Sequence, residues 1–157
     1  MVHCSIILTG SGFPDYATRH FLHAMQAALV VQQPGVPVYC LVDHNPHGVA
    51  ILCVYKYGSC WTLGAHKAAV PVVQWLGLHT AAADHADPQG AGGMQPQHTP
   101  QQTAVLNGLV GRSAPGPMRA ELLRMRVRGR TREVESVAPQ GLTEWVQAAI
   151  ASNQAIV

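Results

Sequence analysis

The sequence has no apolar run that reaches the roughly 18 residues needed to cross a bilayer. Its N-terminus also lacks a charged region followed by an uninterrupted hydrophobic segment, so we expect neither a membrane span nor a secretory leader. The four cysteines show no CxxC spacing and fall mostly within apolar runs. We therefore expect reduced core thiols of an intracellular protein, and no structural zinc site.

Charged side chains are scarce, at 11% of the chain, and the formal net charge of +2 is too small to indicate nucleic-acid binding by itself. Eight of the ten basic residues are arginines, and most lie between Arg112 and Arg132. This row could follow a phosphate backbone, or it could be the solvated face of a helix partly paired with glutamates, which we favour. The residues concerned are Arg119, Arg124, Arg126, Arg128, Arg130 and Arg132, with Glu121, Glu133 and Glu135.

Apolar residues make up 48% of the 157 positions, which is enough for the core of one globular unit. Apolar runs predict strands over 5–9, 36–42 and 70–76, and Pro71 fits the last of these only near its start or on a sheet edge. With helices between the strands, this order indicates an α/β fold with a parallel sheet.

Cap residues and helical spacing predict where the helices lie. Asp15 is placed to begin a helix that continues to the break at 32–35, with Ala17, Phe21 and Met25 at helical spacing. A second helix is predicted over 47–57 after Pro46, with Gly58 as its end. Further helices are predicted over 103–110, 117–128 and 143–152, with breaks at Gly129 and 139–141.

We expect the chain to have three parts: an α/β core over 1–80, a loop or insertion over 81–100, and a helical part over 101–157 that packs on the same domain. The middle segment is a mixture of Ala, Gly, Pro, Gln and His with too little apolar content to order itself.

Two strand-to-helix turns carry the most informative residues. The tripeptide Asp43-His44-Asn45 follows an apolar run directly and precedes Pro46, which places a carboxylate at the carboxyl end of a strand. The earlier turn over 10–15 is rich in glycine. Because open α/β sheets bind phosphates and metal ions at this edge, the two turns indicate a phosphate-handling face.

These turns and their surroundings resemble a known family. The resemblance lies in an ordered series of blocks: Thr9-Gly10-Ser11-Gly12-Phe13-Pro14-Asp15, Ala17-Thr18-Arg19, Phe21-Leu22, Pro37-Val38-Tyr39, Leu41-Val42-Asp43, Pro46-His47-Gly48, Ile51-Leu52 and Tyr55-Lys56-Tyr57-Gly58-Ser59. The series is similar to the Toprim domain of the topoisomerase VI A subunit, and most similar to the eukaryotic branch that makes meiotic DNA double-strand breaks. It continues more loosely through Val70-Pro71, Trp75-Leu76-Gly77-Leu78 and Arg119-Ala120-Glu121-Leu122.

The resemblance implies a partial Toprim (Rossmann-like) parallel sheet flanked by helices, in a type II, ATP-hydrolysing DNA topoisomerase-like protein of the nucleus. It implies Mg²⁺ as cofactor, DNA as partner, and a homodimer or a hetero-oligomer with a topoisomerase VI B-like subunit. A tyrosine of a winged-helix domain would attack the DNA, while Toprim carboxylates bind magnesium beside it. The residues it assigns are Asp43 and Asn45 to the metal, and Gly10, Gly12, Arg19, His47, Lys56 and Ser59 to DNA or phosphate.

Each assignment has a plainer alternative. Asp43 and Asn45 could only shape a turn and cap the following helix. Gly10 and Gly12 could form a tight turn with a left-handed residue. Arg19 could lie on a solvated helix face, and Lys56 could be a solvated surface residue, which we slightly favour for it.

The chain departs from the family pattern at positions that bear on activity. The family has an aspartate where Asn45 stands and a lysine where Ser11 stands, and its metal-binding glutamate and nucleophilic tyrosine lie upstream of Ser5 in the family order. We therefore expect no DNA cleavage by this chain alone. Two alternatives to part of an enzyme stay open: an inactive or truncated relative that binds DNA or a partner, and a phosphate-binding α/β protein unrelated to DNA.

Overall fold

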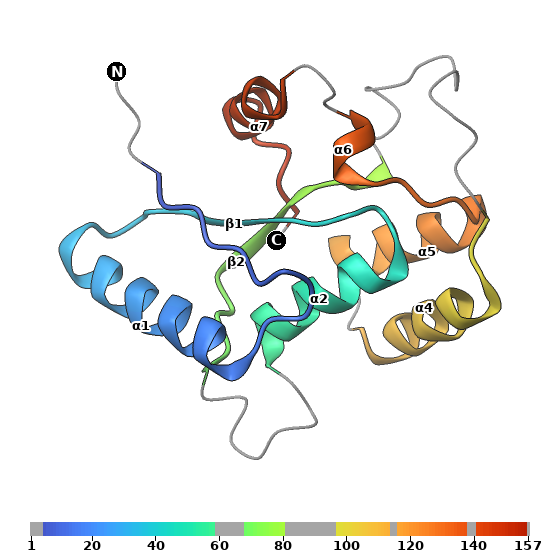
Figure 1. Ribbon diagram of the computed structural model, residues 1–157, viewed down its shortest axis with the longest axis horizontal. Coiled ribbons are helices and arrows are strands. Elements are labelled where there is room, and N and C mark those ends of the chain that lie inside the picture. The colour runs from blue at the N-terminus through green and yellow to red at the C-terminus, as the bar shows by residue number, and fades with distance from the viewer. Residues whose placement is uncertain (1–4, 59–67, 81–96, 114–115, 138–140, 157) are drawn as a thin grey trace. The chain divides into compact units, whose positions relative to one another are not determined.

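The structure is a computed structural model that describes residues 5–58, 68–80, 97–113, 116–137 and 141–156 (Figure 1). The described residues fall into two compact units, one within 1–36 and 53–71 and the other within 37–52 and 72–157. Helix α2 (Pro46–Tyr57) contributes its N-terminal part to the second unit and its C-terminal part to the first. The expected three-part division of the chain stays a prediction.

The second unit contains a two-stranded parallel sheet. Strands β1 (Val38–Leu41) and β2 (Val73–Gly77) lie side by side, with Val38 opposite Val73 and a register shift after Cys40 (Figure 1). On β2, Trp75 exchanges two backbone hydrogen bonds with Ile156 in an antiparallel bridge. The strands predicted over 36–42 and 70–76 and the α/β class with a parallel sheet are therefore confirmed, although both strands are shorter than expected.

Four helices complete the second unit: α4 (Pro100–Arg112), α5 (Pro117–Arg128), α6 (Val134–Val137) and α7 (Leu142–Ala151). The three long ones confirm the predicted helices, while the sequence pattern did not predict α6. Helices α4 and α5 lie next to each other (Figure 1). Fully buried side chains from the sheet and from these helices form the core, among them Trp75, Leu106, Leu122 and Met125.

The first unit is built on helix α1 (Tyr16–Gln32). Asp15 caps it as predicted, because its carboxylate accepts a hydrogen bond of 2.7 Å from the Thr18 N–H. The His23 ring contacts the Ala69 carbonyl at 2.8 Å, and the Val70 N–H donates to the Tyr55 carbonyl. Helix α2 ends at Gly58 as predicted, with φ at 84°.

The predicted strand over 5–9 is wrong. Residues 5–10 have no strand conformation, and the side chains of Ile6 and Ile7 are 66% and 91% exposed. A strand is stable only when its backbone groups are paired with a neighbouring strand, and no described strand pairs with this segment.

The buried face of α1 also differs from the predicted pattern. Phe21 is 54% exposed, whereas Arg19 and Leu22 are the buried residues of the helix. Arg19 can be buried because its Nε donates to the Asp15 carbonyl and its guanidinium lies 5.8 Å from the centre of the Tyr16 ring. Helical spacing of apolar residues therefore did not identify which side of this helix is covered.

Two of the cysteines, Cys40 and Cys53, lie in the described chain, and neither is in a disulfide. Cys40 lies in β1, and burial raises the pKa of its thiol to about 12. Cys4, Cys60 and most of the predicted loop over 81–100 lie outside the described residues. None of the described helices has the length and apolar character needed to span a membrane.

Gly48, in the first turn of α2, has no room for a side chain. A Cβ at this position would lie 2.3 Å from the Asp43 carbonyl oxygen, which is a backbone atom and cannot move aside. We expect Gly48→Ala to lower the free energy of unfolding by about 1–3 kcal/mol, in chemical denaturation followed by circular dichroism.

Gly111 provides the matched control, since it also lies in a helix and a Cβ there would meet no atom within 4 Å. Gly111→Ala should stabilise the protein by about 0.5–1 kcal/mol because alanine is the better helix former. Equal effects of the two substitutions would contradict this packing argument.

Candidate functional site

The turn after β1 lies in the second unit and places three consecutive polar residues in different surroundings. Asn45 is the N-cap of α2, because its side-chain oxygen accepts a hydrogen bond of 2.7 Å from the Gly48 N–H. Pro46 follows as the first helical residue, where its missing N–H costs nothing. The sequence folds locally into this turn because Asn, Pro and Gly each match the position that they occupy.

Asp43 lies at the carboxyl end of the sheet and is half-buried. Its Oδ1 accepts a hydrogen bond of 2.9 Å from the Val134 N–H, the first backbone donor of α6. Since helix N-termini carry unsatisfied N–H groups, this contact caps α6 across 91 residues of sequence. The capping roles considered for Asp43 and Asn45 are thus both present in the structure.

These two residues decide how well a magnesium ion fits. Asp43 supplies one carboxylate, with one of its two oxygens already bonded, and the Asn45 oxygen is used in a cap. In the described residues, no three side chains among His, Cys, Asp and Glu gather closely enough to bind a metal ion. The pair fits Mg²⁺ only as a one-carboxylate site completed by water and phosphate oxygens, a mode that Mg²⁺ uses commonly.

His44 points into the protein between these two residues and is only 4% exposed. Its backbone N–H and carbonyl both bond to Arg132, at 2.8 and 3.0 Å. Its Nε2 lies 3.3 Å from the Thr80 hydroxyl and 3.7 Å from the Glu121 carboxylate. The side chain of His44 therefore links the turn after β1 to the end of β2 and to α5.

Glu121 is the most buried charged side chain in this region, at 1% exposure. Its carboxylate accepts hydrogen bonds from the Thr80 backbone N–H and, at 2.7 Å, from the Arg124 guanidinium. Burial by itself raises the pKa of the Glu121 carboxyl, but hydrogen bonds from His44, Thr80 and Arg124 outweigh burial and lower it to about 2. The group is therefore a carboxylate at every pH at which the protein is expected to work.

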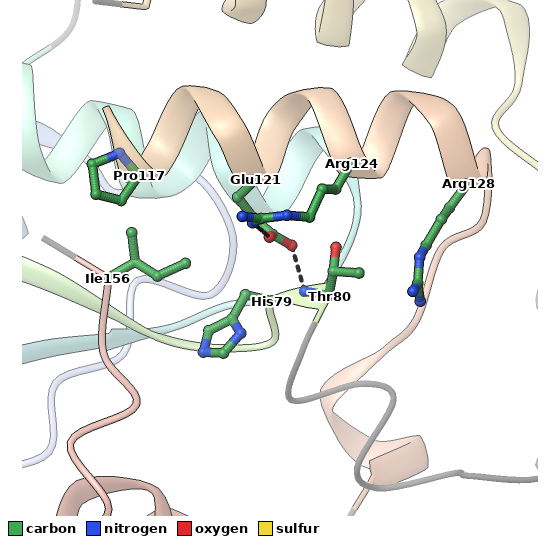
Figure 2. Close-up of a pocket in the computed structure, with 7 residues that line it drawn as sticks. All are labelled: His79, Thr80, Pro117, Glu121, Arg124, Arg128 and Ile156. Carbon is green, nitrogen blue, oxygen red and sulfur yellow. Dashed lines mark hydrogen bonds and ion pairs between the residues drawn. The ribbon is translucent and has the colours of Figure 1, made fainter. Parts of the chain in front are cut away.

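Figure 2 shows the hollow beside this carboxylate, with the Glu121 side chain of α5 directed at Thr80 and the Arg124 side chain directed at Glu121. The hollow has a volume of about 470 Å³ and is lined by His79, Thr80, Pro117, Glu121, Arg124, Arg128 and Ile156. His79 contacts the Gln154 carbonyl at 2.9 Å. Because Glu121 pairs with Arg124 on its wall, the positive charge of this hollow is reduced to that of Arg128.

The remaining predicted site residues lie mainly in the first unit. Gly12 is exposed with φ at 110° and Ser11 has φ at 48°, so the left-handed turn expected as the alternative is present. Arg19 is 2% exposed and Lys56 is 8% exposed, which contradicts the solvated surface that we favoured for Lys56. Burial lowers the pKa of Lys56. His47 is half-buried in the second unit, and Ser59 lies outside the described residues.

Sequence reasoning missed the role of Glu121, although a signal for it was present. Met118, Leu122 and Met125 repeat at helical spacing, and all three are buried. Glu121 falls on the same face, so a carboxylate in the core of a basic helix could have been predicted from that spacing.

Comparisons with known proteins agree with the sequence blocks. The family described as the Toprim domain of topoisomerase 6 A-subunit/Spo11 proteins matches residues 2–150. Meiotic recombination protein SPO11-1 of Oryza sativa subsp. indica is 44% identical over 77 residues, which are 48% of this chain and 19% of that protein. Meiotic recombination protein SPO11 of Homo sapiens is 43% identical over 74 residues, which are 46% of this chain and 17% of that protein. The matches thus span less than a fifth of the length of these relatives.

The buried carboxylate makes stability depend on pH. The pKa of Glu121 is about 2 in the folded protein, whereas its ordinary value is 4.5. The contribution of this carboxylate to the free energy of unfolding is therefore fully present above pH 4.5 and is lost as the pH falls toward 2. We expect this loss to reach at most about 3 kcal/mol. The Glu121→Gln substitution should make the free energy of unfolding depend less on pH between 4.5 and 2.

Urea unfolding at several pH values between 6 and 2 measures the effect. Glu135→Gln makes the same charge change on an exposed side chain of α6 and serves as the control. A Glu121→Gln protein with the same pH slope as the wild type and the Glu135→Gln control would contradict the assignment.

Proposed function

We propose, because this chain belongs to the topoisomerase 6 A-subunit/Spo11 Toprim domain family, that it is the magnesium-binding and DNA-contacting part of a topoisomerase-like protein that makes double-strand breaks in meiotic recombination. The relatives' names supply the meiotic process. The single observation that carries the proposal is the position of Asp43, which lies two residues after the end of β1, within the part of the chain that matches the family.

The residues of this chain would contribute binding and charge to such a reaction. Asp43 offers a carboxylate at the sheet edge, where a hard divalent cation and a DNA phosphate can meet. When bound, Mg²⁺ stabilises negative charge that develops on the phosphoryl and leaving oxygens. Asn45 keeps α2 capped and so fixes the turn that carries Asp43.

The proposed DNA contacts are Gly10, Gly12, Arg19, His47, Lys56 and Ser59. Gly12 supports this assignment best, because it is exposed and a Cβ at its position would meet no atom within 4 Å, so a phosphate could approach the backbone closely. Arg19 and Lys56 are buried, at 2% and 8% exposure, so the structure supports these two contacts less well.

Strand cleavage would need a nucleophile that this chain does not provide in its Toprim blocks. The four tyrosines, Tyr16, Tyr39, Tyr55 and Tyr57, lie in those blocks or, for Tyr16, between two adjacent ones. We propose that a winged-helix domain supplies the attacking tyrosine, and that the protein acts in the nucleus as a homodimer or with a topoisomerase VI B-like subunit.

A second candidate function is a DNA-binding or interaction module without catalytic activity. One observation favours it: the side chain at the second family aspartate position is an amide whose oxygen caps a helix. An amide brings no negative charge to a cation, so Mg²⁺ affinity should be low. Magnesium binding at Asp43 separates the two candidates.

We expect Asp43→Asn and Asp43→Ala each to weaken Mg²⁺ binding by roughly tenfold or more, because both remove the carboxylate. The amide of Asp43→Asn can still accept the Val134 hydrogen bond, so only Asp43→Ala should also lose about 1 kcal/mol of stability. Titration of the 157-residue chain with MgCl₂, followed by calorimetry and by its effect on DNA binding, measures the first effect, and thermal unfolding measures the second.

The isosteric pair separates metal binding from capping. If Asp43→Asn bound MgCl₂ as well as the wild type, Asp43 would have a capping role only, and the catalytic proposal would fail in favour of the interaction module.

Asn45→Asp restores the second carboxylate of the family while keeping a good helix cap. We expect it to bind MgCl₂ several-fold more tightly than the wild type because the added charge attracts the cation, with little change in thermal stability. An unchanged affinity in the same titration would show that the capping oxygen is not accessible to a cation.

A further inference from the structure

The structure separates the arginines of the C-terminal region into two groups. Arg119 donates from Nη1 to the Val110 and Ser113 carbonyls at 2.7 Å each, so it satisfies the end of α4. Arg124 pairs with Glu121. These two arginines therefore serve the fold. The other group consists of Arg126, Arg128 and Arg130, which are exposed, as Arg124 is, and which line a second hollow.

The second hollow has a volume of about 430 Å³, and its lining also includes Gln97, His98 and Thr103. No aspartate or glutamate is among the described residues that line it. The lining of the first hollow combines the Glu121 carboxylate with Arg124 and Arg128, whereas the charged side chains in the lining of this one are all arginines. It therefore attracts anions.

The hollow is built on fixed backbone. Gly129 takes a left-handed conformation with φ at 64°, which ends α5 and turns the chain so that Arg130 lies opposite Gln97 in an antiparallel bridge. The His98 N–H donates to the Gly129 carbonyl at 2.9 Å. Two segments distant in sequence are thereby connected, and α4 packs against α5 beside them (Figure 1).

One polar atom of His98, in the lining of the hollow, has an unused capacity for a hydrogen bond. Its Nε2 is buried and has no hydrogen-bond partner in the described residues. Burial lowers the pKa of the His98 ring. A buried polar atom without a partner is costly, so a water molecule that donates to this nitrogen would stabilise it.

We propose that this basic hollow binds the phosphate backbone of a nucleic acid. This inference rests on the proposed function, since it assigns a second DNA contact distinct from the turn at Asp43. Arginine suits the role because its planar fork donates two hydrogen bonds to one phosphate. Three arginines line this one hollow, which gives it more than one guanidinium with which to bind successive phosphates of a nucleic-acid backbone.

Salt-dependent DNA binding tests the proposal. Each phosphate contact adds about 0.9 to the slope of log affinity against log salt, so the affinity lost between about 50 and 200 mM salt should be about 3.5-fold smaller when one contact is removed. We expect this change in Arg126→Gln and in Arg130→Gln, measured by fluorescence anisotropy with a labelled DNA duplex and the 157-residue chain.

Arg112→Gln is the matched control, because Arg112 is an exposed arginine at the end of α4 that does not line the hollow. It makes the same change in net charge and should leave the salt slope unchanged. Equal losses in all three variants would overturn the proposal, because they would show a general charge effect. Binding of an acidic peptide but not DNA, with the same dependence on Arg126 and Arg130, would overturn it in favour of a protein partner.

The outcomes also separate this inference from the proposed function. If the chain bound DNA and responded to MgCl₂ through Asp43 while Arg126→Gln and Arg130→Gln behaved as wild type, only the second contact would be wrong. If the wild-type chain bound no DNA at low salt, the proposed function itself would fail.

Discussion

The second unit depends on one buried carboxylate. Glu121 contacts three parts of the fold at once: the end of β2 through Thr80, the turn after β1 through His44, and its own helix through Arg124. A charge with 1% exposure is tolerated only because donors surround it, and removing one partner of such a group commonly costs about 3–5 kcal/mol. The sheet ends and α5 are therefore fixed relative to one another by electrostatics as well as by apolar packing.

The same network determines where the candidate metal ligand lies. His44 points inward to Glu121, and the neighbouring Asp43 contacts the N-terminus of α6 through Val134. Arg132, which lies shortly before Val134, pairs its backbone with His44. Three consecutive residues thus have different roles. Asp43 is a candidate ligand that also caps α6, His44 makes a contact in the core, and Asn45 caps α2. The short turn is therefore held in place by contacts with three other parts of the second unit.

The sequence was informative where local chemistry decides the structure. Asp15, Pro46, Gly58 and Gly129 act as helix boundaries at the predicted places, because capping and left-handed geometry depend on the residue type itself. The position of Asp43 at the end of a strand could also be predicted, because this residue follows an apolar run directly. The family resemblance came from ordered blocks, and the match over residues 2–150 confirms it.

The predictions that were wrong concern structure that depends on partners distant in sequence or on contacts that a hydrophobicity pattern does not show. A run such as 5–9 has strand-like composition, but pairing decides whether it forms a strand. Arg19 is buried by contacts with Asp15 and Tyr16 that a hydrophobicity pattern ignores. Which arginines bond to Glu121 or to the end of α4, and which line the second hollow, could be seen only once Glu121 was known to face the core and the α4 carbonyls to lie beside Arg119.

The thiol of Cys40 illustrates how burial in a small sheet affects reactivity. Thiolates, and not thiols, attack alkylating reagents and peroxide. With a pKa of about 12, only on the order of one Cys40 side chain in 100,000 is ionised at neutral pH. The packed strand therefore slows the reaction of the Cys40 sulfur with such reagents, so faster labelling of this sulfur would report that the sheet has opened.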